Sequence, residues 1–517
     1  MLGIAAAAGA LAACSASAAS PGSAYASPAT AAATLRAGAV SMPAAVTRAP
    51  ATADSVLADT APGALTAAFA RALFASAPVV VVSATAGQAV RVAAADASAA
   101  HAPLLLASPL TAKSLAQLAA SARAFHPVAV LTEGLPAAWP GKLAAALPGV
   151  KVVGKPASLP ATRAPAPLSR LAVLVPAAGT AAPGTSSASI AAVTDTARSA
   201  GAAVVDVTGT DPRTDPAAIT ALARLRPEKV VAVGAQFGPA SRLAGRIAVA
   251  ETGRQLPGGG QVLFPGHRLV ALYGHPGTPG LGVLGRQDLS ASIARARQMA
   301  AAYRPLSRVP VVPAFEIIAT VAEASPGPDG TYSYETPVSE LLPWVRQATA
   351  DGLYVVLDLQ PGRASLLAQA EHYESLLALP DVGLALDAEW KLQPGQKPLR
   401  QIGHVDISEV NSVVSWLAAL TARHDLPQKL LVLHQFQLAM LTGERYLDTS
   451  DDDLAIVIHM DGQGTPRVKQ GTWNAVTAAA PRGVFFGWKN FLVKDHPMLT
   501  PRQTMAETPA PVMISYQ

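Results

Sequence analysis

Short, almost continuously apolar runs alternate with helix-like segments along most of the chain. The first runs lie at residues 79–82, 103–108 and 128–131, and segments rich in small helix-forming residues fill the intervals. Runs that are apolar at every position are typical of parallel strands covered on both faces. The order strand–helix–strand–helix–strand therefore predicts a Rossmann-like α/β half over residues 63–154.

The same order recurs after a proline-rich linker at residues 155–169. Its predicted strands and helices lie at residues 171–175, 190–199, 203–207, 217–225 and 229–233. The segments RAFHPVAVLTEG and RLRPEKVVAVGAQFG both run from a basic residue through proline and a buried strand to a glycine exit. This repetition predicts a second Rossmann-like half over residues 170–265.

Residues 266–517 contain eight apolar runs of the same kind. They lie at residues 269–273, 309–315, 353–357, 382–386, 429–433, 454–458, 483–486 and 512–515. Amphipathic segments separate them, at residues 290–303, 340–351, 365–379, 408–424, 436–442 and 473–479. Eight strands alternating with helices over about 250 residues predict a (β/α)8 TIM barrel. We expect the helix near residues 240–252 to cover the flank of the last strand.

Composition narrows the class of protein. Half of the residues are apolar but only 14% are charged, and the mean hydropathy is +0.31. Past the first dozen residues no stretch approaches the roughly 20 large apolar residues of a membrane-spanning helix, which argues against a polytopic membrane protein. A single cysteine excludes a disulfide scaffold. The net charge of +5 is scattered singly, so we expect no nucleic-acid partner.

The amino terminus carries a targeting motif. Leu11-Ala12-Ala13-Cys14 follows a short run of small apolar residues and resembles the lipobox of bacterial lipoproteins. The resemblance implies that residues 1–14 form a signal peptide and lipobox, with a lipid on Cys14 anchoring the product to the outer face of the cytoplasmic membrane. Without the lipid, the protein would be secreted. Residues 15–62 are rich in Ala, Ser, Thr and Pro and predict a disordered tether.

The first predicted half also resembles a known surface module. PVVVVSATAG, ADASAAHAPLLLAS and HPVAVLTEG are similar to the type 2 cell wall-binding repeat of Gram-positive surface proteins. That resemblance implies a partner in cell-wall polysaccharide or peptidoglycan.

Polar residues gather where the predicted barrel strands end, which is where barrel enzymes carry their chemistry. The acidic pair Asp387 and Glu389 ends the fourth strand. Residues two apart in a strand project to the same face, so both carboxylates are expected at the barrel mouth. Two close carboxylates do not both ionise freely, and one becomes a general acid near neutral pH. A strand-end Asp that caps the next helix is the structural alternative.

Asp387-Ala388-Glu389 resembles the Asp-x-Glu of glycoside hydrolase families 18 and 25. The resemblance implies that Glu389 is the proton donor and Asp387 its electrostatic partner. Asp358 or Asp461 would supply the second carboxylate that glycoside hydrolysis requires. Other strand-end residues are candidate sugar contacts, namely Tyr273, His275, Glu316, Trp390, His434, Gln435 and Trp488.

Two functions remain open at this point. One is an envelope-anchored or secreted glycoside hydrolase-like enzyme that acts on cell-wall polysaccharide. The other is a cell-wall-binding surface protein whose barrel is a non-catalytic scaffold. We expect no cofactor; the PGGGQ segment at residues 257–261 lacks the strand–turn–helix context of a phosphate loop. The Gly-x-Ser-x-Gly elbow of a serine nucleophile is also absent from the sequence. We expect no metal, because the strand-end histidines lack the His-x-His pattern typical of metal-dependent barrel hydrolases.

Overall fold

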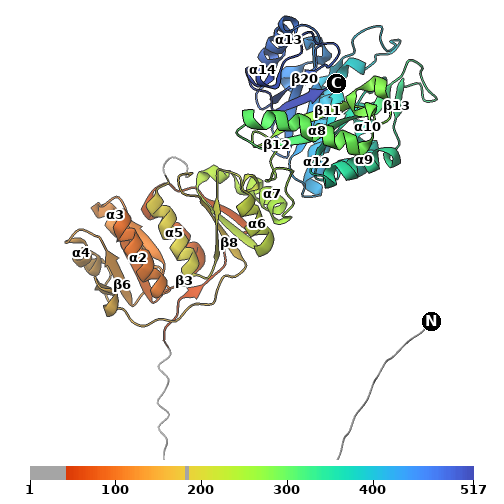
Figure 1. The fold of residues 1–517 in the computed structure, drawn as a ribbon. Coiled ribbons are helices and arrows are strands. Elements are labelled where there is room, and N and C mark those ends of the chain that lie inside the picture. Colours follow the sequence, from red (N-terminus) through yellow and green to blue (C-terminus); the bar gives the residue numbers. More distant parts are fainter. Residues whose placement is uncertain (1–41, 181–184) are drawn as a thin grey trace, which may run out of the picture. The chain divides into compact units, whose positions relative to one another are not determined.

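The computed structural model describes residues 42–180 and 185–517 (Figure 1). Cys14, the predicted leader and most of the predicted tether lie outside the described residues, so the lipobox stays a prediction. Within the described ranges, no helix has both the length and the apolar character needed to cross a bilayer.

The first α/β half forms around a four-stranded parallel sheet. Its strand order is β5-β4-β6-β7, with β4 at Val79–Ala84, β5 at Leu104–Ala107, β6 at Ala129–Glu133 and β7 at Lys151–Val153. Every residue of β4 and β5 is buried, as the continuous apolar runs predicted. The helices are α1 (Pro62–Leu73), α2 (Gly87–Ala99), α3 (Ala112–Arg123) and α4 (Trp139–Ala146).

Part of the predicted tether is ordered, which corrects the boundary at residue 62. Strand β1 (Val46–Thr47) pairs antiparallel with β3 (Phe74–Ser76). Strand β2 (Asp54–Leu57) lies parallel to β10 (Lys229–Val233) as an edge strand of the second sheet. The segment looked structureless because β2 has only four residues and gains its backbone partners from a strand about 175 positions further along the chain.

The second half follows the same plan. Its sheet order is β2-β10-β8-β9, with β8 at Leu171–Pro176 and β9 at Ala203–Val207. The helices are α5 (Ser187–Ser199), α6 (Pro216–Leu225) and α7 (Ala240–Glu251). Asp215 caps α6 by accepting hydrogen bonds from the backbone N–H groups of Ala217 and Ala218, and Pro216 occupies the first helical position.

Residues 268–517 form a closed barrel of eight parallel strands, which confirms the predicted fold class. The strands, in order around the barrel, are β11 (Arg268–Gly274), β12 (Val311–Ala322), β14 (Tyr354–Leu359), β15 (Val382–Asp387), β17 (Lys429–His434), β19 (Leu454–Met460), β20 (Phe485–Asn490) and β21 (Met513–Tyr516). The barrel closes because β11 pairs with both β12 and β21. The helices around it are α8 (Leu289–Tyr303), α9 (Val338–Ala350), α10 (Leu366–His372), α11 (Glu374–Leu377), α12 (Ile407–Arg423), α13 (Pro466–Ala479) and α14 (Pro501–Met505).

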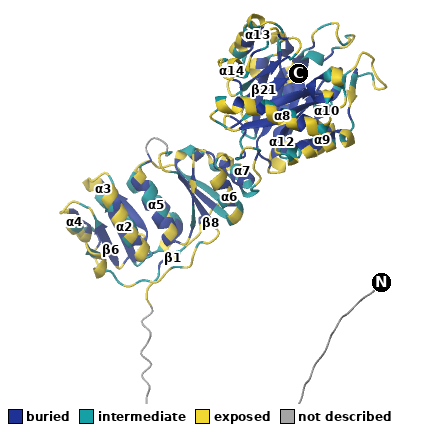
Figure 2. Cartoon of the chain, viewed as in Figure 1, coloured by how far each residue is buried: buried dark blue, intermediate teal, exposed yellow. Residues whose placement is uncertain are grey.

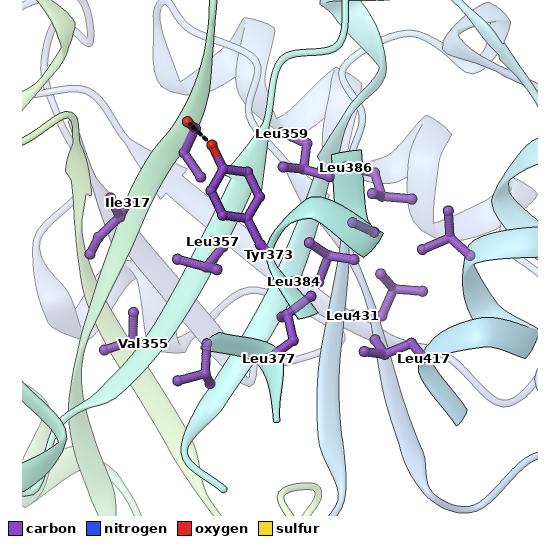
Figure 3. Packing of buried hydrophobic residues seen from close by; sticks show 14 of the residues in the cluster. Ile317, Val355, Leu357, Leu359, Tyr373, Leu377, Leu384, Leu386, Leu417 and Leu431 are labelled. Atoms are coloured by element: carbon purple, nitrogen blue, oxygen red, sulfur yellow. Dashed lines mark hydrogen bonds between the residues drawn. The ribbon is translucent and has the colours of Figure 1, made fainter. Parts of the chain in front are cut away.

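Alternate residues of each barrel strand face opposite sides. Outward residues such as Leu357, Leu384 and Leu431 pack against Leu377, Leu417 and Tyr373 of the surrounding helices and their junctions (Figure 3). Inward residues of the amino-terminal half of the barrel form a second apolar cluster, which includes Ala271, Val356 and Val432. Strands are accordingly the most buried parts of the chain (Figure 2).

Two barrel expectations were wrong. Residues 436–442 do not form a helix, because 3-10 turns and the two-residue strand β18 (Leu441–Thr442) occupy that connection. The flank of β21 is not covered by α7, which packs within the second α/β half. Tyr303 of α8 and Met505 of α14 pack against Ile514 of β21 instead.

A cluster of charges around the buried Arg213 joins the second half to the barrel. Arg213 is 1% exposed, and its guanidinium lies 2.7 Å from Asp453, 2.9 Å from Asp452 and 3.0 Å from Asp211. Arg246 also contacts Asp211 and Asp452. Asp452 and Asp453 directly precede β19, so the cluster meets the barrel at the amino ends of its strands.

The Arg213 cluster predicts a stability effect. Arg213→Met would leave partly buried carboxylates without their main partner, and we expect the free energy of unfolding to fall by about 2–4 kcal/mol. Urea denaturation would measure the change. Arg170→Met is the control, because Arg170 pairs with Glu228 on the surface and its loss should cost no more than about 1 kcal/mol. Equal effects of the two substitutions would contradict a stabilising role for the cluster.

Candidate active site

One inward polar side chain from each of the eight barrel strands lies in a layer near the carboxyl ends. In strand order these are Tyr273, Glu316, Asp358, Asp387, His434, His459, Lys489 and Ser515. All eight are buried. The alternation that points them inward also places the apolar cluster directly below them. We call these eight side chains the polar layer; inside the barrel they lie directly above the inward apolar cluster.

His434 carries the central charge of this layer. Its Nε2 lies 3.0 Å from Glu316 Oε1, and its Nδ1 lies 3.2 Å from Asp461 Oδ2. Burial would lower the pKa of His434, but Glu316 and Asp461 hold it well above its ordinary value. Burial likewise opposes ionisation of Glu316, yet His434 lowers the pKa of that carboxyl to about 2. The site thus contains an imidazolium between two carboxylates.

Asp358 lies on the same side of His434 as Glu316, with its Oδ1 3.7 Å from Nε2. It accepts a hydrogen bond of 2.8 Å from the Tyr273 hydroxyl, which in turn lies 3.3 Å from the Gln360 amide nitrogen. Burial raises the pKa of Asp358 to about 6, and His434 only partly opposes that shift.

Asp387 and Glu389 both retain protons that ordinary carboxyls would lose. Burial, then Glu389 and Asp358, raise the pKa of Asp387 well above its usual range. Burial, then Asp461, raise the pKa of Glu389 to about 7. Asp461 differs, because His434 outweighs its burial and lowers its pKa. Glu389 is therefore a proton donor near neutral pH, while the neighbouring Asp461 is ionised.

The local geometry of Asp387 and Glu389 differs from the expectation of one strand face. Strand β15 ends at Asp387, and Glu389 lies in a 3-10 turn formed by Ala388–Trp390. The turn lifts Glu389 out of the polar layer, and Gly403 donates a backbone hydrogen bond of 2.7 Å to its carbonyl. As a result Asp387 is buried, whereas Glu389 is partly exposed.

A cavity of about 340 Å³, which we call the main cavity, opens above the polar layer. Glu389, Asp461, Lys489, Tyr273 and Trp390 are among the residues that line it. A second cavity, of about 330 Å³, shares Glu389, Trp390 and Leu399 with the first and extends along residues 398–402. Of the four predicted catalytic carboxylates, Glu389 and Asp461 line the main cavity, and Asp358 and Asp387 lie in the layer beneath it.

Several predicted sugar contacts have other roles. Trp488 is fully buried against Trp473, so the expectation that it contacts a sugar is wrong. His275 bonds Thr278 and Thr336, Gln435 bonds Glu444, and Glu316 bonds His434. None of these three side chains lines the cavity, whereas Tyr273 and Trp390 do. His434 acts within the polar layer.

Sequence reasoning did not single out Lys489, His459 or Gly487. Lys489 and His459 stood at predicted strand ends, but only the closed barrel brings them beside Glu316. His459 Nε2 lies 2.7 Å from Ser515 Oγ, and burial lowers its pKa to about 3. A Cβ at position 487 would lie 1.9 Å from His459 Nδ1, so the glycine makes room for this ring.

Among the described residues, Asp451, Asp452 and Asp453 form the group whose ligand atoms are close enough together to hold a metal ion. Arg213 and Arg246 contact two of these carboxylates. This donor set is therefore already neutralised by arginines and fits a cation poorly.

His434→Gln should destabilise the protein by about 3–5 kcal/mol, because Glu316 would stay buried without its cation. Glu316 stabilises the fold above its ordinary pKa of 4.5 and loses this contribution as the pH falls through about 2. The raised pKa of His434 makes its contribution complete below 6.5 and lost only above the raised value. The free energies of unfolding of wild type and His434→Gln, measured by urea denaturation, should therefore differ more between pH 4.5 and 6.5 than they do near pH 3. His372→Gln, at an exposed pair with Glu335, is the control; a pH-independent difference would contradict the charge assignment.

Comparison of the chain with models of protein families, with curated proteins and with solved structures found no match in any of the three.

Proposed function

We propose that the barrel is a glycoside hydrolase-like enzyme and that cell-wall polysaccharide is its substrate. The observation that carries the proposal is the pairing of a proton donor with an ionised carboxylate in one cavity. Glu389 has a pKa of about 7, and the neighbouring Asp461 has a lowered pKa. Glycosidic bonds are cleaved by such a pair of carboxyl groups with opposite protonation.

In the proposed reaction Glu389 donates its proton to the glycosidic oxygen as the bond to the anomeric carbon breaks. The positive charge that develops on the sugar ring is stabilised by the carboxylate of Asp461, which serves as base or nucleophile. Water then supplies the hydroxyl group of the new sugar end. Its proton passes to Glu389 where Asp461 acts as nucleophile, or to Asp461 where Asp461 acts as base, and exchange with solvent then restores the proton of Glu389 and the charge of Asp461. The ring of Trp390 lines the cavity beside Glu389 and offers a stacking face for a sugar.

Other residues of the polar layer keep Asp461 ionised and Glu389 protonated. His434 keeps Asp461 ionised. Asp387 is protonated, so it adds no negative charge beneath Glu389. Its predicted role as electrostatic partner therefore becomes that of a neutral neighbour whose proton is held by burial.

A non-catalytic, wall-binding barrel remains the alternative function. Asp358 and Asp387 favour it, because both are buried and neither lines the cavity. The resemblance of residues 78–134 to a cell wall-binding repeat supports wall binding under either function.

Glu389→Gln tests the catalytic proposal. The amide keeps the size of the side chain but cannot donate an acidic proton, so release of reducing sugar ends from purified wall material should fall about a thousandfold. Glu371→Gln, an exposed position on α10, is the control and should leave release unchanged. If wild-type protein releases no sugar ends, or if Glu389→Gln releases as much as wild type, the scaffold function replaces the enzyme.

The pH dependence of kcat/KM is a second test. Glu389 must be protonated, so activity should fall as the pH rises through about 7. Asp461 must be ionised, so the acidic limb should lie below its ordinary pKa of 3.8. An alkaline limb near 4.5, the ordinary pKa of Glu389, would contradict its assignment as a buried acid.

A further inference from the structure

Lys489 is a buried cation that lines the main cavity. Its side chain is 3% exposed. Its Nζ lies 3.4 Å from the centre of the Tyr273 ring and 5.6 Å from that of Phe491. Within residues 42–180 and 185–517, no carboxylate pairs with this ammonium and no acceptor hydrogen-bonds to it. An aromatic face attracts a cation but does not satisfy three N–H donors.

The neighbouring Lys469 shows what a paired lysine looks like in this region. Its Nζ lies 2.5 Å from Asp495 Oδ2 and 2.6 Å from the carbonyl oxygen of Lys489. Burial of an ammonium is costly unless hydrogen bonds compensate for the lost water. Lys489 is equally well buried, so its donors are available for a group that enters the cavity.

Three of the carboxyl groups that feel the charge of Lys489 already have other partners. Glu316 and Asp461 share His434, and Asp358 accepts the Tyr273 hydroxyl. Lys489 influences these three groups and Glu389 only at a distance, and its charge acts to lower the pKa of each.

A second amine reinforces the positive character of this part of the cavity. Lys494 also lines it, and its Nζ lies 5.9 Å from the same Phe491 ring. While Glu389 is protonated, the charged side chains lining the cavity are those of these two lysines and Asp461. The uncharged polar side chains that line it are those of Tyr273, Trp390, Gln360, Gln463 and Gln517.

We propose that Lys489 binds an anionic group, a carboxylate or a phosphate, on the sugar that occupies this cavity. The proposal rests on the proposed function for the identity of the ligand as a glycan. An acidic sugar would give the buried ammonium both hydrogen-bond acceptors and a counter-charge, whereas the hydroxyl groups of a neutral sugar would supply acceptors alone. The cavity therefore selects acidic glycans over neutral ones.

Binding measurements test this in the Glu389→Gln background, where turnover does not consume the glycan. Soluble wall-glycan fragments are titrated calorimetrically in three forms: native, carboxyl-reduced, and dephosphorylated. We expect removal of the recognised anion to weaken binding at least about tenfold, and the form that loses affinity identifies carboxylate or phosphate. Equal affinity for all three forms would overturn the proposal, and this comparison needs no change at Lys489.

Lys489→Met in the same background then assigns the contact. It should weaken binding of native glycan about tenfold and leave binding of the neutralised form unchanged. Lys142→Met, which removes an exposed cation from α4 in the first half, should affect neither form. An equal loss for native and neutralised glycan would mean that Lys489 acts only through the neighbouring carboxylates, and would overturn the proposal.

The outcomes separate this inference from the proposed function. If wild-type protein binds acidic glycan selectively but releases no sugar ends, the proposed hydrolase activity is wrong and the proposed anion site at Lys489 still holds. If the protein releases sugar ends but binds acidic and neutral glycan equally well, the hydrolase activity holds and the anion site at Lys489 is wrong.

Discussion

The charge on His434 is the interaction on which the candidate site depends. Two carboxylates are buried in the barrel at 3.0 and 3.2 Å from its ring nitrogens, and neither would remain ionised there without a cation. Because Asp461 keeps its negative charge, Glu389 beside it loses its proton less readily. The ionised state of Asp461 is thus a consequence of one buried imidazolium, whereas the raised pKa of Glu389 comes first from its own burial and then from the charge of Asp461.

Barrel closure is what brings these groups together. Each strand contributes one inward side chain at the same level, so residues from Tyr273 to Ser515 share one layer although they span most of the domain. The apolar cluster below keeps water from the amino-terminal side, and the cavity above opens at the carboxyl ends. The Arg213 cluster meets the barrel at the opposite, amino-terminal end of β19, so attachment of the α/β halves and access to the cavity involve different ends of the strands.

Much of the secondary structure could be predicted because the strands are doubly covered. Strands such as β4, β8 and β14 are buried at every position, and a continuous apolar run identifies such a strand without knowledge of its partners. Strand β2 and the 3-10 turns after β17 were missed for the opposite reason, since neither has a local pattern. The site was predicted at the correct strand ends for Asp358, Asp387, Glu389 and Asp461. The sequence did not predict that Asp358 and Asp387 lie below the cavity while Glu389 and Asp461 line it. That difference depends on where β15 ends and on the turn that carries Glu389.

The sequence by itself determined that the chain contains two α/β halves and an eight-stranded barrel, and that acidic residues follow its strands. Hydrophobic periodicity and strand-end polarity are local properties, so they can be read along the chain. Only the tertiary structure decided which acids are protonated, that Trp488 packs inside while Trp390 lines the cavity, and that Lys489 lacks an anionic partner among the described residues. Burial and charge pairing decide these properties, and both depend on neighbours that the folded barrel brings from distant strands.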